Sequence, residues 1–162
     1  MPADPRPDSH VLDRAPETRR RDAEDTEQSL RRSLYEPSAE LTALSHEVIG
    51  AAIEVHRHLG PGFTEVMYRR ALCRELARRH LPFESEVTFH IDYKGDAIGE
   101  LRLDLIVDQR LVVELKAVER LSSVHTAQAI SYLRASGLQL GLILNFNVAA
   151  LHQGIKRVVW SR

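Results

Sequence analysis

A chain of 162 residues can bury one ordinary hydrophobic core and is too short for two of full size. Its net charge of -1 excludes the strong basic excess that would by itself indicate a nucleic-acid-binding protein, so any phosphate-binding surface must be local. The single cysteine, Cys73, excludes an internal disulfide and multi-cysteine metal sites within one chain. Because no apolar run resembles a signal peptide or a membrane span, we expect a cytoplasmic protein with no membrane contact.

Residues 1–40 differ in composition from the rest of the chain. They are rich in proline and contain 7 Lys and Arg against 10 Asp and Glu, whereas the remainder contains 15 basic and 13 acidic residues. Such a segment cannot bury enough apolar surface to offset the entropy lost on ordering. We therefore predict a disordered, acidic, proline-rich arm over 1–40, with at most a transient helix near 25–34, and one domain over 41–162.

Two amphipathic helices are predicted at the start of the domain. Apolar residues recur at spacings of three and four over 41–59, and Gly60-Pro61-Gly62 ends this first helix. The second is expected over 64–80 with Thr64 as its N-cap. Its predicted apolar stripe runs through Met67, Ala71 and Leu76. Its arginines either contact phosphates or form a solvated face: Arg69, Arg70, Arg74, Arg78 and Arg79.

Strand-like patterns follow the two helices. Apolar and polar residues alternate over 87–93, 101–107 and 111–117, which predicts three strands. A third helix is expected over 122–136, followed by a very apolar strand over 138–146 and a short closing segment, IKRVVW. The order α-α-β-β-β-α-β predicts an α/β fold, in which helices flank a mixed β-sheet.

The second and third strands carry opposed carboxylates. A three-residue turn between them places Val107 opposite Leu111 and therefore Asp104 opposite Glu114. Directly opposed side chains lie about 4.5–5.5 Å apart, where two like charges are destabilising unless something compensates them. Lys116 is expected on the same face, because side chains alternate along a strand. The opposite, apolar face is expected to hold Leu103, Leu105, Val113 and Leu115.

Asp104, Glu114 and Lys116 together suit the hydrolysis of a phosphodiester bond. Carboxylate oxygens are the ligands that Mg²⁺ or Mn²⁺ prefers, and such an ion activates water and offsets charge on the phosphate. Lys116 would orient or deprotonate that water and stabilise the transition state. The alternative is a solvated strand face on which a Glu-Lys pair has no chemical role.

Several motifs in one order resemble the GxxExxY proteins, a branch of the PD-(D/E)xK nuclease-like superfamily. The motif behind the family name reads Gly62-Phe63-Thr64-Glu65-Val66-Met67-Tyr68 in this chain. The likeness covers nearly all of 44–159 and includes IGAAIEVHRHLGPG, RLDLIV, VVELKAV, HTAQAISYL and LILNFNV. The resemblance implies a restriction-endonuclease-like core, metal-ligand roles for Asp104 and Glu114, and a catalytic role for Lys116.

The same resemblance implies that Glu65 reaches the site as a further metal ligand. It also matches Gln128 and Tyr132 to the QxxxY helix motif of RecB-like and lambda-exonuclease-like enzymes. These two residues are four apart and share one helix face with His125 nearby, so their convergence is geometrically sound. Alternatively, Glu65 is a first-turn carboxylate favoured by the helix dipole, and Tyr132 belongs to the core. We favour site roles for Glu65 and Gln128 ahead of Tyr132 and His125.

The sequence therefore predicts a nuclease dependent on Mg²⁺ or Mn²⁺, with DNA favoured over RNA and a homodimer suggested by analogy with small nucleases. The strongest rival is a non-catalytic module that binds nucleic acid or protein on the same fold. A third alternative is an accessory subunit that docks to a protein partner through residues 1–40. No histidine spacing typical of a metal site and no phosphate-binding glycine loop is present.

Overall fold

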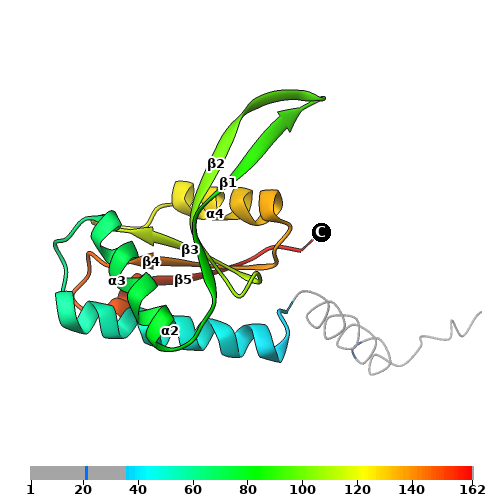
Figure 1. The fold of residues 1–162 in the computed structure, drawn as a ribbon. Coiled ribbons are helices and arrows are strands. Elements are labelled where there is room, and N and C mark those ends of the chain that lie inside the picture. Colours follow the sequence, from blue (N-terminus) through cyan, green and yellow to red (C-terminus); the bar gives the residue numbers. More distant parts are fainter. Residues whose placement is uncertain (1–20, 22–35, 162) are drawn as a thin grey trace, which may run out of the picture. The chain divides into compact units, whose positions relative to one another are not determined.

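The computed structural model describes Arg21 and residues 36–161 (Figure 1). The elements within 36–161 are α2 (Ala39–Leu59), α3 (Glu65–Arg78), β1 (Phe83–Tyr93), β2 (Asp96–Val107), β3 (Leu111–Lys116), α4 (Ser123–Ser136), β4 (Leu140–Asn145), the 3-10 helix η1 (Leu151–Gly154) and β5 (Ile155–Val159). None of the helices in this described part is long and apolar enough to cross a bilayer. The α/β fold was predicted, and the closing segment adds β5, a strand that the sequence left unassigned.

Most of the predicted arm, including the transient helix near 25–34, lies outside the described residues. Its last residues do not, because α2 begins at Ala39, two residues before the predicted domain boundary. The Ser38 hydroxyl accepts a hydrogen bond from the Leu41 N–H at 3.2 Å, as expected of an N-cap. At the other end, Gly60 has φ +67, a left-handed conformation that favours glycine. The chain therefore leaves α2 where the sequence predicted.

α3 turns a different face to the core from the one predicted. Tyr68, Leu72 and Leu76 are its buried residues, whereas Met67 is 51% exposed. The helix is thus rotated by about one residue relative to the predicted stripe. Thr64 does occupy the N-cap position, but its side chain makes no capping hydrogen bond.

Tyr68 fixes the start of α3 against the rest of the fold. Its ring stacks on Phe146 with the ring centroids 4.4 Å apart. Its hydroxyl donates to the Gly60 carbonyl at 2.6 Å and accepts from the Phe63 N–H at 3.1 Å. A buried tyrosine that satisfies its hydroxyl in this way ties the loop between α2 and α3 to the core.

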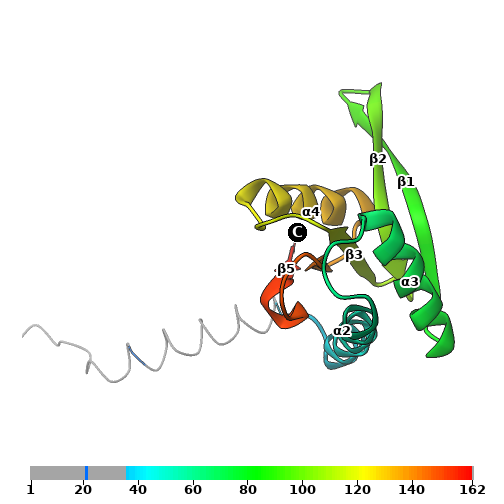
Figure 2. The same cartoon turned by 90° about the vertical axis from the view of Figure 1, so that its left-hand side faces the viewer.

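The sheet is mixed and has the strand order β1-β2-β3-β4-β5. All neighbouring strands are antiparallel except β3 and β4, which are parallel and joined through α4. The β1–β2 hairpin turns at Lys94 and Gly95, both at positive φ, and extends beyond the rest of the sheet (Figures 1 and 2). A crossover helix between parallel strands is the arrangement that the predicted element order required.

Helices cover both faces of the sheet, with α2 and α3 on one and α4 on the other (Figure 2). The core under α2 and α3 takes these residues from the sheet: Leu105, Val107, Leu111, Val113, Leu115, Leu140, Leu142 and Leu144. The core under α4 takes these: Leu103, Ile106, Val112, Ile143 and Val158. Burial on both faces explains why β3 and β4 are almost entirely apolar.

Leu103 corrects one prediction. Simple alternation placed it on the same face as Leu105, yet it packs in the core under α4. Regular pairing of β2 with β3 ends at Leu105, and beyond that point β2 pairs only with β1. The β1–β2 pairing skips Glu86 and Asp104, and Glu86 has φ +56, so the regular alternation of side chains is interrupted there on both strands. The reversal occurs at Asp104, the residue between the two leucines.

Gly154, the last residue of η1, is expected to tolerate no side chain. A Cβ there would collide with the Asn145 carbonyl oxygen, so β4 would have to move. We expect Gly154→Ala to lower the free energy of unfolding by about 3 kcal/mol, measured by urea denaturation. Gly141→Ala is the control, because its Cβ would meet only the Leu133 side chain at 3.5 Å. Equal losses in both variants would contradict the prediction.

Candidate active site

The predicted register of the central hairpin is confirmed, because Val107 pairs with Leu111. Regular pairing ends just before Asp104 and Glu114. At this point the Asp104 side chain replaces the backbone pairing: its Oδ2 accepts a hydrogen bond from the Leu115 N–H at 2.9 Å. The carboxylate thus occupies the place of a strand acceptor at the point where β2 leaves β3.

Glu114 is a buried carboxylate, only 5% exposed, in the middle of β3. Its Oε1 accepts a hydrogen bond from Lys116 Nζ at 2.9 Å, while its buried Oε2 has no hydrogen-bond partner. Burial, and then the nearby charge of Asp104, raises the pKa of Glu114 from 4.5 to about 7, although Lys116 acts in the opposite direction. Lys116 therefore only partly offsets the cost of ionising Glu114 in this buried position beside Asp104.

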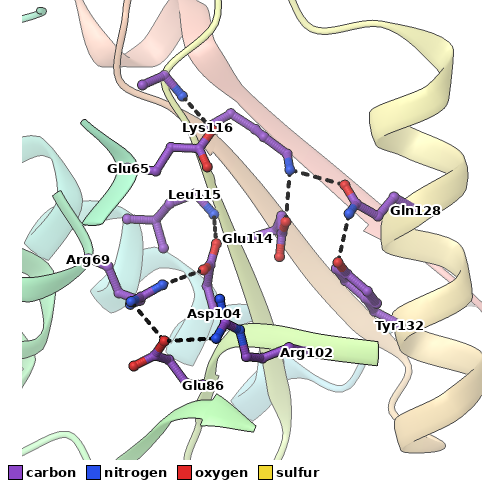
Figure 3. A network of polar contacts seen from close by, with 11 residues as sticks. Glu65, Arg69, Glu86, Arg102, Asp104, Glu114, Leu115, Lys116, Gln128 and Tyr132 are labelled. Atoms are coloured by element: carbon purple, nitrogen blue, oxygen red, sulfur yellow. Dashed lines mark hydrogen bonds and ion pairs between the residues drawn. The ribbon is translucent and has the colours of Figure 1, made fainter. Parts of the chain in front are cut away.

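Lys116, Gln128 and Tyr132 form one line of hydrogen bonds between β3 and α4 (Figure 3). Lys116 Nζ donates to Gln128 Oε1 at 3.0 Å, and Gln128 Nε2 donates to the Tyr132 hydroxyl at 2.7 Å. Burial and the charge of Glu114 raise the pKa of Tyr132 to about 12, so its hydroxyl stays protonated at neutral pH. The structure thus brings the predicted helix pair to the predicted lysine.

Glu65 also reaches this end of β3, from the first turn of α3 (Figure 3). Its Oε1 accepts a hydrogen bond from the Ala117 N–H at 3.2 Å, one residue beyond Lys116. His125 has a different task, since its Nδ1 accepts from the Ser122 N–H at 3.0 Å and so caps the start of α4.

Arg69 belongs to the site, although the sequence analysis named it only among five arginines that contact phosphates or form a solvated face. Its Nη1 lies 3.0 Å from Asp104 Oδ1, and its Nη2 lies 3.0 Å from Glu86 Oε1 on β1 (Figure 3). A second guanidinium, of Arg102, lies 3.6 Å from the same Glu86 oxygen. Arg69 follows Glu65 by four residues and therefore shares its helix face, a signal that would have suggested its place in the site.

Asn145 was also missed, although a lone polar residue in the apolar run LILNF was visible in the sequence. It is 2% exposed and lies at the end of β4, beside β3. Its Oδ1 accepts from the Val118 N–H at 3.0 Å, and its Nδ2 donates to the Val118 carbonyl at 2.8 Å. This pair of hydrogen bonds fixes the backbone just after Lys116 and so helps to hold Lys116 in position.

The donor atoms fit a divalent cation chemically, but they do not form a complete cage. Among the residues that the structure describes, no group of three or more His, Cys, Asp or Glu side chains is arranged to hold a metal ion. The predicted set of Asp104, Glu114 and Glu65 is therefore not assembled as a three-residue site. The groups that suit a cation are the unpartnered Oε2 of Glu114 and the carboxylate of Asp104 beside it, since both are hard oxygen donors. At Asp104 Oδ1, a cation would compete with Arg69.

Fold and site together define the class of protein: an α/β core whose central hairpin carries two carboxylates and a lysine. A family model described as the PD-(D/E)XK nuclease superfamily matches residues 42–158, which is most of the chain. The chain belongs to this superfamily, as the sequence predicted, and the restriction-endonuclease-like fold is confirmed with it. No curated protein and no solved structure matches the chain significantly.

Proposed function

We propose that the protein is a metal-dependent nuclease that hydrolyses phosphodiester bonds in nucleic acid. The observation that carries the proposal is the juxtaposition of Asp104, Glu114 and Lys116, with one buried Glu114 oxygen left unpartnered. A buried carboxylate oxygen without a hydrogen-bond partner is unfavourable in a protein that only needs to fold, and a bound cation removes the penalty. Membership of a nuclease superfamily supports the same activity.

Each residue of the site has a proposed role. Asp104 and Glu114 would hold Mg²⁺ or Mn²⁺, and Glu65, which accepts a hydrogen bond from the Ala117 N–H next to Lys116, would join through a shift of its side chain. The ion would lower the pKa of a bound water and offset charge on the phosphate. Lys116 points its amino group at Glu114, from where it can orient the attacking water and stabilise the developing charge. Gln128, hydrogen-bonded to Tyr132, positions Lys116.

Finer parts of the proposal rest on sequence motifs. The motif over 62–68 and the Gln128-Tyr132 spacing support assignment to the GxxExxY branch and its QxxxY helix. We further propose DNA in preference to RNA as substrate, action in the cytoplasm, and a homodimer that addresses both strands. Docking of a protein partner through residues 1–40 is a separate proposal, which deletion of that segment and a test for partner loss would address.

Titration calorimetry with Mg²⁺ and Mn²⁺ tests the metal site, and cleavage of mixed DNA and RNA substrates tests the activity. We expect the wild type to bind the ion and cleave one substrate class, and Asp104→Asn/Glu114→Gln to lose both. Glu47→Gln, an exposed carboxylate on α2, serves as control and should behave like the wild type. Ion binding that survives in the double variant would refute the proposed ligands.

A second candidate function is a non-catalytic module that binds nucleic acid without cleaving it. The contact between Arg69 and Asp104 favours it, because an internal cation already neutralises one of the two carboxylates. Binding of nucleic acid that needs no divalent ion, with no cleavage at any ion concentration, would make this the better account.

A further inference from the structure

A hollow of about 440 Å³ lies between α3 and β1. Its α3 side is formed by Arg69, Arg70, Arg74 and Cys73, and its β1 side includes Ser85 and Glu86. Three guanidinium groups thus face one carboxylate, so the hollow has an excess of positive charge in a protein whose net charge is -1. A local basic hollow of this kind is a candidate site for an anion.

Within the described part of the chain, Arg70 and Arg74 lack the ion pairs that the other arginines on α3 and at its C-cap make. Arg69 pairs with Asp104 and Glu86, and Arg78 and Arg79 both pair with Glu75. Neither Arg70 nor Arg74 makes an ion pair or a side-chain hydrogen bond with any residue in the described part of the chain. They are four residues apart on one helix, a spacing at which like charges repel unless an anion lies between them.

Arg69 connects this hollow to the candidate active site. One of its terminal nitrogens contacts Asp104 Oδ1, and the other contacts Glu86, which lines the hollow. A single guanidinium group therefore separates the carboxylates from the hollow. A nucleic-acid strand carries a charge at every nucleotide. Two neighbouring phosphates of one strand could therefore lie at the candidate active site and in the hollow at the same time.

We infer that this hollow binds a backbone phosphate of the nucleic-acid strand, next to the phosphate that is hydrolysed. Arg70 and Arg74 are then the residues that position the strand. Guanidinium groups suit the task, because their fork of N–H donors matches the oxygens of a phosphate. The inference rests on the proposed function for the identity of the strand, and on the unpaired arginines for the site itself.

Binding of fluorescein-labelled DNA and RNA oligonucleotides, measured by anisotropy in EDTA so that nothing is cleaved, tests the inference. We expect Arg70→Gln/Arg74→Gln to weaken binding about tenfold or more at low salt and to reduce the slope of log K against log salt by about one to two. Arg78→Gln/Arg79→Gln, at the C-terminal end and C-cap of the same helix, is the control with the same change of net charge. Equal affinities of the wild type and Arg70→Gln/Arg74→Gln would overturn the inference, as would a wild type that binds no oligonucleotide.

Cys73 offers a second readout, because it is the chain's single cysteine and lines the hollow. Burial raises the pKa of its thiol, so alkylation is followed at alkaline pH. A bound oligonucleotide should slow the reaction, and inorganic phosphate at the same phosphate concentration should not. Equal protection by inorganic phosphate would show a site for the free ion and overturn the role in positioning a strand.

The two proposals fail in different ways. Loss of oligonucleotide binding in Arg70→Gln/Arg74→Gln, from a wild type that never cleaves, would refute the nuclease and leave the hollow supported. Cleavage by the wild type, with unchanged binding in this variant, would refute the hollow and leave the nuclease supported.

Discussion

We expect Lys116→Met to lower the rate of phosphodiester cleavage by about two to four orders of magnitude. Methionine keeps most of the aliphatic stem but removes the amino group that contacts Glu114 and Gln128 at 2.9 and 3.0 Å. The attacking water would then lose the group that orients it and stabilises charge on the phosphate. Single-turnover cleavage at saturating metal is the measurement, because it isolates the chemical step from product release.

The matched control is Lys156→Met, which removes an exposed lysine of β5 and should leave the rate unchanged. Stability must be checked in parallel, since the substitution leaves Glu114 buried without its partner. Breaking a buried pair costs about 3 kcal/mol, so the two proteins are compared where thermal melting shows both to be folded. A folded Lys116→Met protein that cleaves at the wild-type rate would remove Lys116 from the mechanism.

The second large effect is a change in how stability depends on pH when Glu114 is replaced by Gln. The pKa of Glu114 is about 7 in the folded protein and near 4.5 in an unfolded chain. The folded state therefore binds the proton more tightly, and the stability that this provides is present below pH 4.5 and is lost as pH rises to 7. The loss amounts to about 3 kcal/mol for the wild type and is absent in Glu114→Gln.

Urea denaturation of both proteins at pH 4.5 and pH 8, without divalent ions, measures this effect. The difference in free energy of unfolding between wild type and Glu114→Gln should shift by about 3 kcal/mol in favour of the variant at pH 8. Glu47→Gln, which replaces an exposed carboxylate of α2, is measured in parallel as the control. Addition of Mg²⁺ at pH 8 should stabilise the wild type and Glu47→Gln but not Glu114→Gln, because a ligand that binds the folded state alone raises its stability. A pH-independent difference would mean that Glu114 ionises normally.

Much of the candidate site follows from local periodicity, which a sequence displays directly. A short turn determines which residues of a hairpin face each other, so the pairing of Val107 with Leu111 was predictable. Strand alternation placed Lys116 beside Glu114, and the helical repeat placed Gln128 beside Tyr132. These relations hold over two to four residues of chain and need no knowledge of the remaining fold.

Only the tertiary structure decided how these pieces meet. The hydrogen bond from Arg69 to Asp104 joins residues 35 apart, and that from Ala117 to Glu65 joins residues 52 apart. The rotation of α3 depends on Tyr68 stacking against Phe146, a residue at the far end of the chain. The reversal at Leu103 depends on β2 leaving β3 and on the irregular backbone at Glu86, where the pairing of β1 with β2 is interrupted. The sequence by itself thus determined the elements and which residues share a face, whereas long-range packing selected their partners, because many helix rotations and strand twists satisfy the same local pattern.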